Sequence, residues 1–364
     1  MTAAVTDLVE PEASAGFHSL RVARVERLCE DAVAVTFDVP PALRGTYAFR
    51  PGQYLTLRLH RDGREERRSY SICAPVGAAP RIGVRRVDTG LFSEWLVDRL
   101  TPGDEVEVAP PAGSFTPDLE PGVHHGLIAA GSGITPVLSI AASVLAAHPD
   151  TRVTLLYGNR RTDTVMFTEE LADLKNLHGP RLHLVHVLSR EPQEAEIVSG
   201  RLDTDRIRTL LGALVDVGSV GQWWLCGPLG VTEAAAQVLR EFGVGRSRVH
   251  RELFYVDEPP PEVHHADAEP AGETSEVTVV LNGRTTTVAV PRADRVLDGA
   301  QKVRGDLPFA CKGGVCGTCR AKVVEGEVRM RRNFALEDDE VEAGFVLTCQ
   351  ALPVSERVTV DFDA

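Results

Sequence analysis

The chain has 364 residues, of which 43% are hydrophobic, which is enough for two or three domains with ordinary cores. Its formal net charge of −13 argues against nucleic acid as a partner and against docking on an anionic membrane, because both require a basic surface. The chain has seven cysteines, an odd number, and no secretory signal is recognised. A disulfide framework is therefore not expected, and the expected location is the cytoplasm.

Residues 1–16 contain neither the apolar stretch of a signal peptide nor an arginine-rich amphipathic pattern. They are therefore expected to be a disordered leader. Residues 17–120 alternate apolar and polar side chains between proline and glycine turns, which predicts a small antiparallel β-barrel. The expected strands are Leu20–Leu28, Ala32–Val39, Gln53–His60, Arg67–Cys73, Arg81–Val87 and Glu105–Ala109. Leucine and tryptophan recur at helical spacing in Leu91–Leu100, where one helix is expected.

Two segments of this first domain could contact an anionic cofactor. Arg68-Ser69-Tyr70-Ser71 offers a cation, an aromatic face and hydroxyl groups on one strand. Gly90-Leu91-Phe92-Ser93 begins the helix, where free backbone N–H groups bind anions such as pyrophosphate. Each segment alone also fits a plainer interpretation, an ordinary strand with a surface arginine and an ordinary capped helix. The turn Pro51-Gly52-Gln53-Tyr54 leads into the preceding strand.

Residues 121–256 alternate strands and helices, which predicts a doubly wound α/β domain with a parallel sheet covered on both faces. The expected strands are Gly126–Ala130, Val153–Asn159, Leu182–Ser189, Gln222–Gly227 and Arg248–Phe254, and the helices are Thr135–His148, Phe167–His178, Asp203–Leu211 and Val231–Phe242. Residues 126–147 carry no charge over 22 residues, a length that could span a bilayer. Their glycines, proline and hydroxyl side chains fit a buried strand, turn and helix better.

Two glycine turns follow strands of this domain. Residues 131–136 read G-S-G-I-T-P. They lack the third glycine of the dinucleotide fingerprint, but Gly131 and Gly133 permit close backbone approach and Pro136 suits a first helical turn. Cys226-Gly227-Pro228 ends the fourth strand. Together the turns predict a cleft for phosphate and nicotinamide, whereas either alone would be interpreted as a simple connection.

The second and third strands end in Asn159-Arg160 and Ser189-Arg190, where the adenosine half of a dinucleotide would lie. No acidic residue ends the second strand, which favours a cofactor with a 2′-phosphate, NADPH, over NADH. Ordinary surface arginines are the alternative interpretation.

Residues 257–276 contain seven acidic residues and four prolines without Lys or Arg, and are expected to be an extended linker. Residues 277–364 predict an α+β domain in which a sheet grips one helix, the β-grasp arrangement. Asn282-Gly283 is a strong hairpin signal, and Asp294 could cap the helix. The expected elements are strands Val277–Leu281 and Thr285–Val290, helix Arg295–Arg304, hairpin Ala321–Met330, helix Leu336–Ala343 and strand Val358–Asp363.

Four cysteines of this last domain have the spacing of plant-type [2Fe–2S] ferredoxins: Cys311, Cys316 and Cys319, then Cys349 after 29 further residues. Two irons need four thiolates, and the glycines between the cysteines let the loop curl around a cluster. A zinc site would usually show two C-x2-C pairs, and only one is present. Disulfides or inert buried thiols are weaker alternatives, so we predict that these cysteines are the cluster ligands.

A basic strip lies near these cysteines in an otherwise acidic chain, formed by Arg320, Lys322, Arg329, Arg331 and Arg332. A solvated surface is the plain interpretation of such a strip. The alternative is a docking surface for an acidic partner.

The motifs R-x-Y-S, G-x-G-x-T-P, C-G-P and the ferredoxin-type cysteines follow one another between Phe17 and Ala364. This order resembles the ferredoxin–NADP reductase superfamily, in the form with a fused ferredoxin domain that is typical of oxygenase reductases. The resemblance implies FAD, NADPH and a [2Fe–2S] cluster, and a separate di-iron oxygenase component as electron acceptor. A different class, an iron–sulfur redox sensor, stays open, although the flavin and nicotinamide motifs count against it.

The resemblance also implies roles for single residues. Arg68 would hold the flavin pyrophosphate, Tyr70 would lie against the isoalloxazine, and Ser71 would approach its N5 atom. Thr135 and Cys226 would lie near the nicotinamide, and Ser189 with Arg190 would bind the 2′-phosphate. Phe254 would cover the flavin face until nicotinamide displaces it, although plant-type enzymes use a terminal tyrosine and this chain continues. Ser71, Cys226 and Phe254 would thus be the catalytic residues. The residues implied on the diphosphate and adenine side are Val84, Arg85, Arg86, Gly90, Leu91, Phe92 and Ser93.

Overall fold

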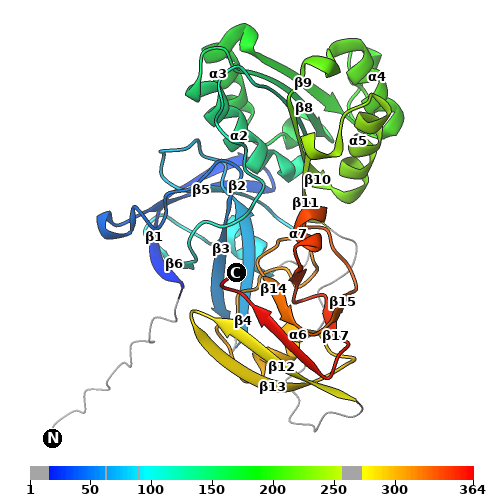
Figure 1. Cartoon of the computed structure of the whole chain (residues 1–364). Coiled ribbons are helices and arrows are strands. Elements are labelled where there is room, and N and C mark those ends of the chain that lie inside the picture. Colours follow the sequence, from blue (N-terminus) through cyan, green and yellow to red (C-terminus); the bar gives the residue numbers. More distant parts are fainter. Residues whose placement is uncertain (1–15, 62–63, 88–90, 256–272) are drawn as a thin grey trace, which may run out of the picture.

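Three sheets of five or six strands follow one another along the chain in the computed structural model, which describes residues 16–61, 64–87, 91–255 and 273–364, and a two-stranded sheet accompanies the last of them (Figure 1). Apart from Gly16, the expected leader lies outside these residues, and so does the expected linker up to Gly272.

The first sheet is antiparallel, with strand order β4-β3-β6-β1-β2-β5. An isolated bridge between Ile72 and Ile82 connects its two edges, just after β4 and within β5. Val33, Val35 and Phe37 alternate toward a fully buried core, as the period of two in a strand requires. The predicted β-barrel fold is confirmed. Its elements are β1 (His18–Cys29), β2 (Ala32–Asp38), β3 (Tyr54–Arg61), β4 (Arg64–Ser71), β5 (Arg81–Arg85), α1 (Leu91–Asp98) and β6 (Glu105–Val108).

The second sheet is parallel throughout, with strand order β11-β10-β7-β8-β9. Helices α2 and α3 contribute to the core on one face, and α4 and α5 to the core on the other. The strand order reverses between β7 and β10, and ligands of doubly wound sheets bind at such a reversal. The elements are β7 (His124–Ala130), α2 (Ile134–Ala147), β8 (Arg152–Asn159), α3 (Thr168–His178), β9 (Leu182–Leu188), α4 (Thr204–Leu214), β10 (Gln222–Pro228), α5 (Leu229–Glu241) and β11 (Val249–Tyr255).

The charge-free stretch 126–147 forms the buried strand β7, a glycine turn and the buried helix α2, as predicted. Within the residues that the structure describes, no helix combines the length and the apolar character needed to cross a membrane.

The third sheet has the order β13-β12-β18-β14-β16 and packs against α6, whose residues Val296, Leu297 and Ala300 are buried. Asn282 and Gly283 both have positive φ, 53° and 66°, as a tight hairpin turn requires. The elements are β12 (Thr274–Leu281), β13 (Arg284–Pro291), α6 (Val296–Gln301), β14 (Arg320–Glu325), β15 (Val328–Met330), α7 (Asp338–Glu342), β16 (Phe345–Leu347), β17 (Ala351–Pro353) and β18 (Arg357–Asp361).

Two local predictions for this domain are wrong. The segment 321–330 is not a hairpin, because β14 pairs with β16 and β18 whereas β15 pairs with β17. The turn at Gly326 packs closely on the segment that begins β18, since an added Cβ would lie 2.0 Å from the Arg357 carbonyl oxygen. At this turn the chain passes from the five-stranded sheet to the two-stranded sheet of β15 and β17. Asp294 does not cap α6, since Arg295 holds the N-cap position without a side-chain bond.

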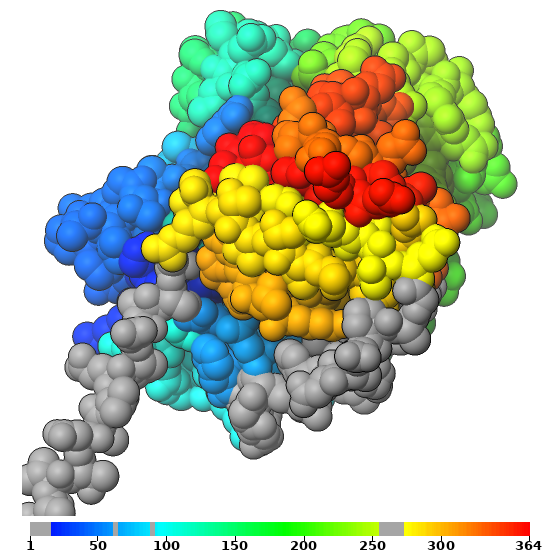
Figure 2. All heavy atoms as spheres, turned by 60° about the horizontal axis from the view of Figure 1, so that its bottom comes forward, coloured from blue at the N-terminus to red at the C-terminus, as the bar shows by residue number. Residues whose placement is uncertain are grey.

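The third domain lies across the first and reaches the second (Figures 1 and 2). An ion pair between Arg246, which precedes β11, and Asp338, which begins α7, joins the second and third domains. All three domains therefore contact one another, which allows a site to draw residues from each.

Candidate functional site

The two glycine turns of the nucleotide domain meet at the point where the strand order reverses. A Cβ at Gly133 would lie 2.3 Å from the Cys226 carbonyl oxygen and 2.8 Å from the Gly227 nitrogen. Gly131 has a positive φ of 57°, which favours glycine. The turns that the sequence singled out are thus in direct backbone contact, and only glycine fits at position 133.

Beside these turns, one carboxyl group connects the barrel to the nucleotide domain. The Ser71 hydroxyl, at the end of β4, donates to Glu252 Oε2 at 3.3 Å, and the Cys226 sulfur lies 4.0 Å from the same oxygen. Ser71 and Cys226 are both buried. The structure therefore brings together two of the predicted catalytic residues and adds a third polar group.

Burial controls the protonation of this group. It raises the pKa of Glu252 to about 8, against the opposing effect of the Ser71 hydrogen bond. Burial also raises the pKa of Cys226 well above its ordinary value, and the nearby Glu252 adds to that rise. At neutral pH the carboxyl group and the thiol are therefore both mainly protonated. Glu252 thus holds a proton, and neither group brings a negative charge into the site.

Sequence reasoning selected Phe254 from the segment 250–254 and missed Glu252. In the structure Glu252 pairs in register with Cys226 across the parallel strands β10 and β11. That register depends on long-range pairing, so no local pattern identifies the residue. Phe254 is partly buried and packs against the core that the barrel and the nucleotide domain share.

The R-S-Y-S segment lies on β4 with alternating orientation. Arg68 is half-exposed and pairs with Glu66 at 3.0 Å, while Tyr70 is partly buried with its ring 6.1 Å from that of Phe92. Ser69, on the other face, shares a hydrogen bond of 3.0 Å with Thr56. A cation and an aromatic ring thus share the face of β4 that a flavin would need.

Other residues implied for the flavin and nicotinamide are less accessible. The Val84 side chain is fully buried in the barrel core, so only its backbone could face a ligand. Thr135 is buried and donates to the Ser132 carbonyl at 3.0 Å. Arg85 donates across the domain boundary to the Thr164 carbonyl, and Arg86 pairs with Asp98 at 3.0 Å.

At the beginning of α1, Phe92 is buried and the Ser93 hydroxyl accepts a hydrogen bond from the Val87 nitrogen at 3.0 Å. The predicted residue Gly90 and the side chain of Leu91 lie outside the described part of the structure.

The four residues predicted for the adenosine end lie together at the edge of the second sheet. The Ser189 nitrogen donates to the Asn159 carbonyl at 2.9 Å, and the Arg190 nitrogen to the Arg160 carbonyl at 2.8 Å. Both arginines are exposed, and neither forms an ion pair with another described residue.

Asn159 is 8% exposed, and its side-chain amide interacts with the Tyr157 hydroxyl but makes no hydrogen bond of good geometry among the described residues. A buried amide without a good hydrogen bond costs about 1–3 kcal/mol. This edge therefore suits a polar, anionic ligand that the chain itself does not supply. Of the two prolines predicted at the glycine turns, Pro136 is buried in the first turn of α2, and Pro228 is exposed at the end of β10.

The four cysteines of the third domain gather as two pairs. A hydrogen bond from Cys316 and three backbone N–H groups lower the pKa of Cys311 below its ordinary value, the N–H donors lying 3.3–3.4 Å from its sulfur. A hydrogen bond from Cys319 likewise lowers the pKa of Cys349. No three Cys, His, Asp or Glu side chains among the described residues converge as a single metal ion requires. Two thiol pairs, one for each iron, fit a binuclear cluster better than one zinc ion.

The backbone around these thiols curls as expected, with positive φ at Lys312, Gly314 and Gly317. Gln350 braces the loop by donating to the Lys312 carbonyl at 2.8 Å.

Tyr54 of the barrel lies close to this loop. Burial raises the pKa of its hydroxyl, and the proximity of Cys316 and Glu252 adds to this rise. Tyr54 therefore lies between the cysteine loop and the carboxyl group that joins the other two domains.

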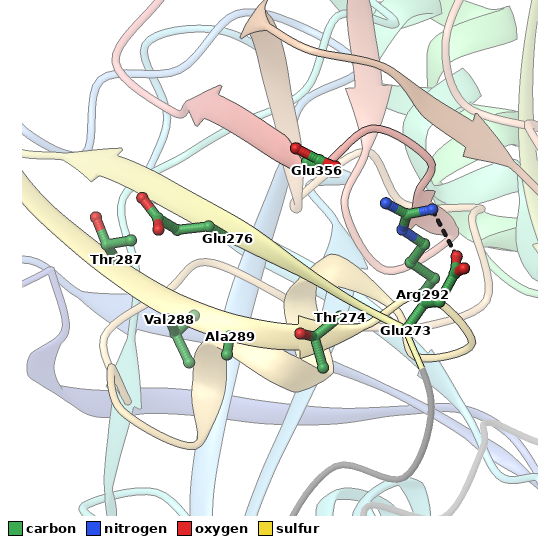
Figure 3. Close-up of a pocket in the computed structure, with 8 residues that line it drawn as sticks. All are labelled: Glu273, Thr274, Glu276, Thr287, Val288, Ala289, Arg292 and Glu356. Atoms are coloured by element: carbon green, nitrogen blue, oxygen red, sulfur yellow. Dashed lines mark hydrogen bonds and ion pairs between the residues drawn. The ribbon is translucent and has the colours of Figure 1, made fainter.

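A surface depression of about 640 Å³ lies away from these groups, on the edge strand β13 and its neighbour β12 (Figure 3). It is lined by Glu273, Glu276 and Glu356 among others, and Arg292 within it pairs with Glu273 at 2.8 Å. It contains no cysteine, so it is separate from the site described above.

Three family models match the chain. They are described as an oxidoreductase FAD-binding domain at residues 19–116, an oxidoreductase NAD-binding domain at 127–237 and a 2Fe-2S iron-sulfur cluster binding domain at 279–354. The last match includes all four cysteines predicted as cluster ligands.

Curated relatives resemble the chain over nearly its whole length. One of the subunits of 1,2-phenylacetyl-CoA epoxidase from Escherichia coli is 40% identical, over 96% of this chain and 98% of that protein. The ferredoxin reductase component of 3-ketosteroid-9-alpha-monooxygenase from Rhodococcus rhodochrous is 36% identical, over 94% and 96%. The solved structure of phthalate dioxygenase reductase has the same fold, with a TM-score of 0.58 and 24% identity over 95% of this chain and 98% of that one.

Proposed function

The chain belongs to the ferredoxin–NADP reductase family, in the form that joins an FAD-binding, an NAD-binding and a C-terminal 2Fe-2S domain, and on this premise we propose that it is the NADPH-dependent reductase component of a multicomponent oxygenase. It is an oxidoreductase. The observation that carries the proposal is the meeting of Ser71, Cys226 and Glu252 from two domains, within reach of a loop that holds three of the four cysteines.

When bound, the flavin would accept hydride from the nucleotide and the cluster would take electrons singly. The residues of this chain would hold the flavin, the nucleotide and the cluster in position. Arg68 and Tyr70 would hold the flavin along β4, and the contact between Gly133 and Cys226 would shape the nicotinamide cleft. Glu252, neutral at pH 7 because of its burial, holds a proton beside Ser71 at the boundary of the two domains.

The preference for NADPH rests on charge. Arg160 and Arg190 are exposed without ion-pair partners in the described chain, beside the buried amide of Asn159. Arginine binds phosphate through parallel, charge-assisted hydrogen bonds. A 2′-phosphate supplies such acceptors and a ribose hydroxyl does not.

The acceptor we propose is the di-iron oxygenase component of a phenylacetyl-CoA ring 1,2-epoxidase, in the cytoplasm. The 40% identity to one component of such an epoxidase supports this choice. The 36% identity to a 3-ketosteroid monooxygenase reductase supports a second candidate, the reductase of another ring-hydroxylating oxygenase. The chemistry of this chain would be the same in both cases.

Replacing Cys316 by Ala tests the electron path. The variant should lose ferredoxin-type visible absorption and the reduction of cytochrome c, while NADPH still bleaches the bound flavin. Full-rate cytochrome c reduction by this variant would contradict the proposal. Reconstitution with purified oxygenase components identifies the acceptor. NADPH consumption coupled to phenylacetyl-CoA supports the epoxidase, and coupling only to a steroid oxygenase supports the second candidate.

A further inference from the structure

The cysteine loop, residues 307–319, touches the barrel through a hydroxyl pair. The Tyr54 hydroxyl lies 3.0 Å from Thr318 Oγ1, in a contact between residues 264 positions apart in sequence. Thr318 stands between Cys316 and Cys319, and Tyr54 is only 6% exposed. A buried tyrosine hydroxyl needs a hydrogen-bond partner, and here the third domain provides it.

A second contact holds the other end of the same loop. Arg67 on β4 is 4% exposed and donates to the Leu307 carbonyl at 3.2 Å. Its guanidinium group lies 4.5 Å from the ring centre of Phe309, and Glu65 neutralises it at 2.6 Å. A buried charge is tolerated only with such partners, so this contact is directional rather than general packing.

The two contacts lie on neighbouring strands with a fixed separation. Tyr54 pairs in register with Ser71, and Arg67 pairs with Arg58. The two pairs are four positions apart along each strand, which corresponds to roughly 13 Å at the rise of an antiparallel strand. The strand pair β3–β4, which lies beside the third domain (Figure 1), therefore carries Ser71, which bonds to Glu252, and both attachment points of the cysteine loop.

We propose that Tyr54 and Arg67 form an intramolecular docking site on β3 and β4, and that they are positioning residues that fix the cysteine loop against the flavin-binding strand. The inference rests on the proposed function, because it assigns these residues to transfer between flavin and cluster. Each electron that a bound flavin would lose on this route would be gained by the bound cluster, and the hydroxyl groups of Tyr54 and Thr318 would keep their protons.

The test uses the cofactor-loaded full chain and the variants Tyr54→Phe and Thr318→Val. Each removes one hydroxyl group and little volume. Matched controls are Tyr47→Phe, which removes a buried hydroxyl bonded within the barrel, and Thr278→Val, which removes one hydroxyl of a hydrogen-bonded pair within the third domain. Thr318→Ser restores the donor and should behave like the parent chain.

Two measurements are made on every variant. Hydrogen–deuterium exchange of residues 306–320 should rise in Tyr54→Phe and Thr318→Val and not in the controls, which reports docking without reference to turnover. In stopped flow, the rate of cluster reduction by flavin should fall about five-fold, the factor for a lost hydrogen bond of about 1 kcal/mol. Flavin bleaching by NADPH should keep its rate.

Unchanged exchange and unchanged cluster reduction in both variants would overturn the inference, and so would equal effects in the controls. The Thr318 hydroxyl also bonds to Cys316, so a double variant whose effect exceeds that of Thr318→Val alone would overturn the inference too, because that single change already removes the bond between the two hydroxyl groups. Failure of the proposed function has another signature, since NADPH would then not bleach the flavin even in the parent chain.

Discussion

The raised pKa of Glu252 makes a quantitative prediction about stability. A carboxyl group that titrates near 8 in the folded chain, rather than at its usual 4.5, is protonated in both folded and unfolded states below about pH 4.5. As pH rises from about 4.5 to 8, the unfolded state ionises first, and the folded state loses stability relative to it. The loss amounts to about 3 kcal/mol at pH 7 and ~5 kcal/mol above pH 8.

Glu252→Gln removes this ionisation and keeps the size of the side chain. The variant should match the parent in unfolding free energy at pH 4.5 and exceed it by about 3 kcal/mol at pH 7. The measurement is urea denaturation from pH 4.5 to 9, followed by fluorescence of Trp223 and Trp224, which lie on β10 beside Cys226. Glu169→Gln, an exposed carboxylate in the first turn of α3, serves as the matched control. A stability difference that does not change with pH would refute the reasoning.

Three further outcomes are expected. Arg190→Ala should raise KM for NADPH roughly 10- to 100-fold by removing a charge-assisted hydrogen bond, and a matching rise for NADH in steady-state kinetics would exclude a role at the 2′-phosphate. Gly133→Ala places a methyl group 2.3 Å from the Cys226 carbonyl oxygen, so it should lower the unfolding free energy by about 1–3 kcal/mol. It should also weaken nucleotide binding in titration calorimetry, and unaltered binding would contradict the proposed nicotinamide cleft. Reversing Arg331 and Arg332 to Glu should slow electron delivery to the oxygenase about ten-fold at low salt and hardly at all at high salt, whereas a salt-independent rate would remove the docking hypothesis.

Local patterns predicted those elements whose cause is local. Alternation of side chains located the barrel strands, and Asn282-Gly283 located a hairpin because both residues tolerate positive φ. The cysteine spacing predicted a 2Fe-2S domain, which a family model confirms at residues 279–354, because three of the four cysteines proposed as ligands lie in one short loop. In each case a few neighbouring residues contain the whole physical reason.

The misses have long-range causes. Glu252 acquires its environment from the register of β11 on β10 and from a barrel residue 181 positions away in sequence. β14 and β15 are separate because they pair with different strands, and the turn between them at Gly326 packs closely against Arg357. Asp294 had the right residue type for a helix cap, but α6 begins after Arg295, and the Asp294 carboxylate accepts a hydrogen bond from Lys302 instead.

The pairing of Tyr54 with Ser71 has a practical consequence for anyone rebuilding this chain. Tyr54 contacts the cysteine loop and Ser71 contacts Glu252. A single residue pair of the barrel therefore positions both the third and the second domain. A shift of β3 by one residue would turn its side chains to the opposite face of the sheet. That single change would displace the contacts to both the second and the third domain. Domain exchange should therefore leave this residue pair untouched and place its junctions elsewhere.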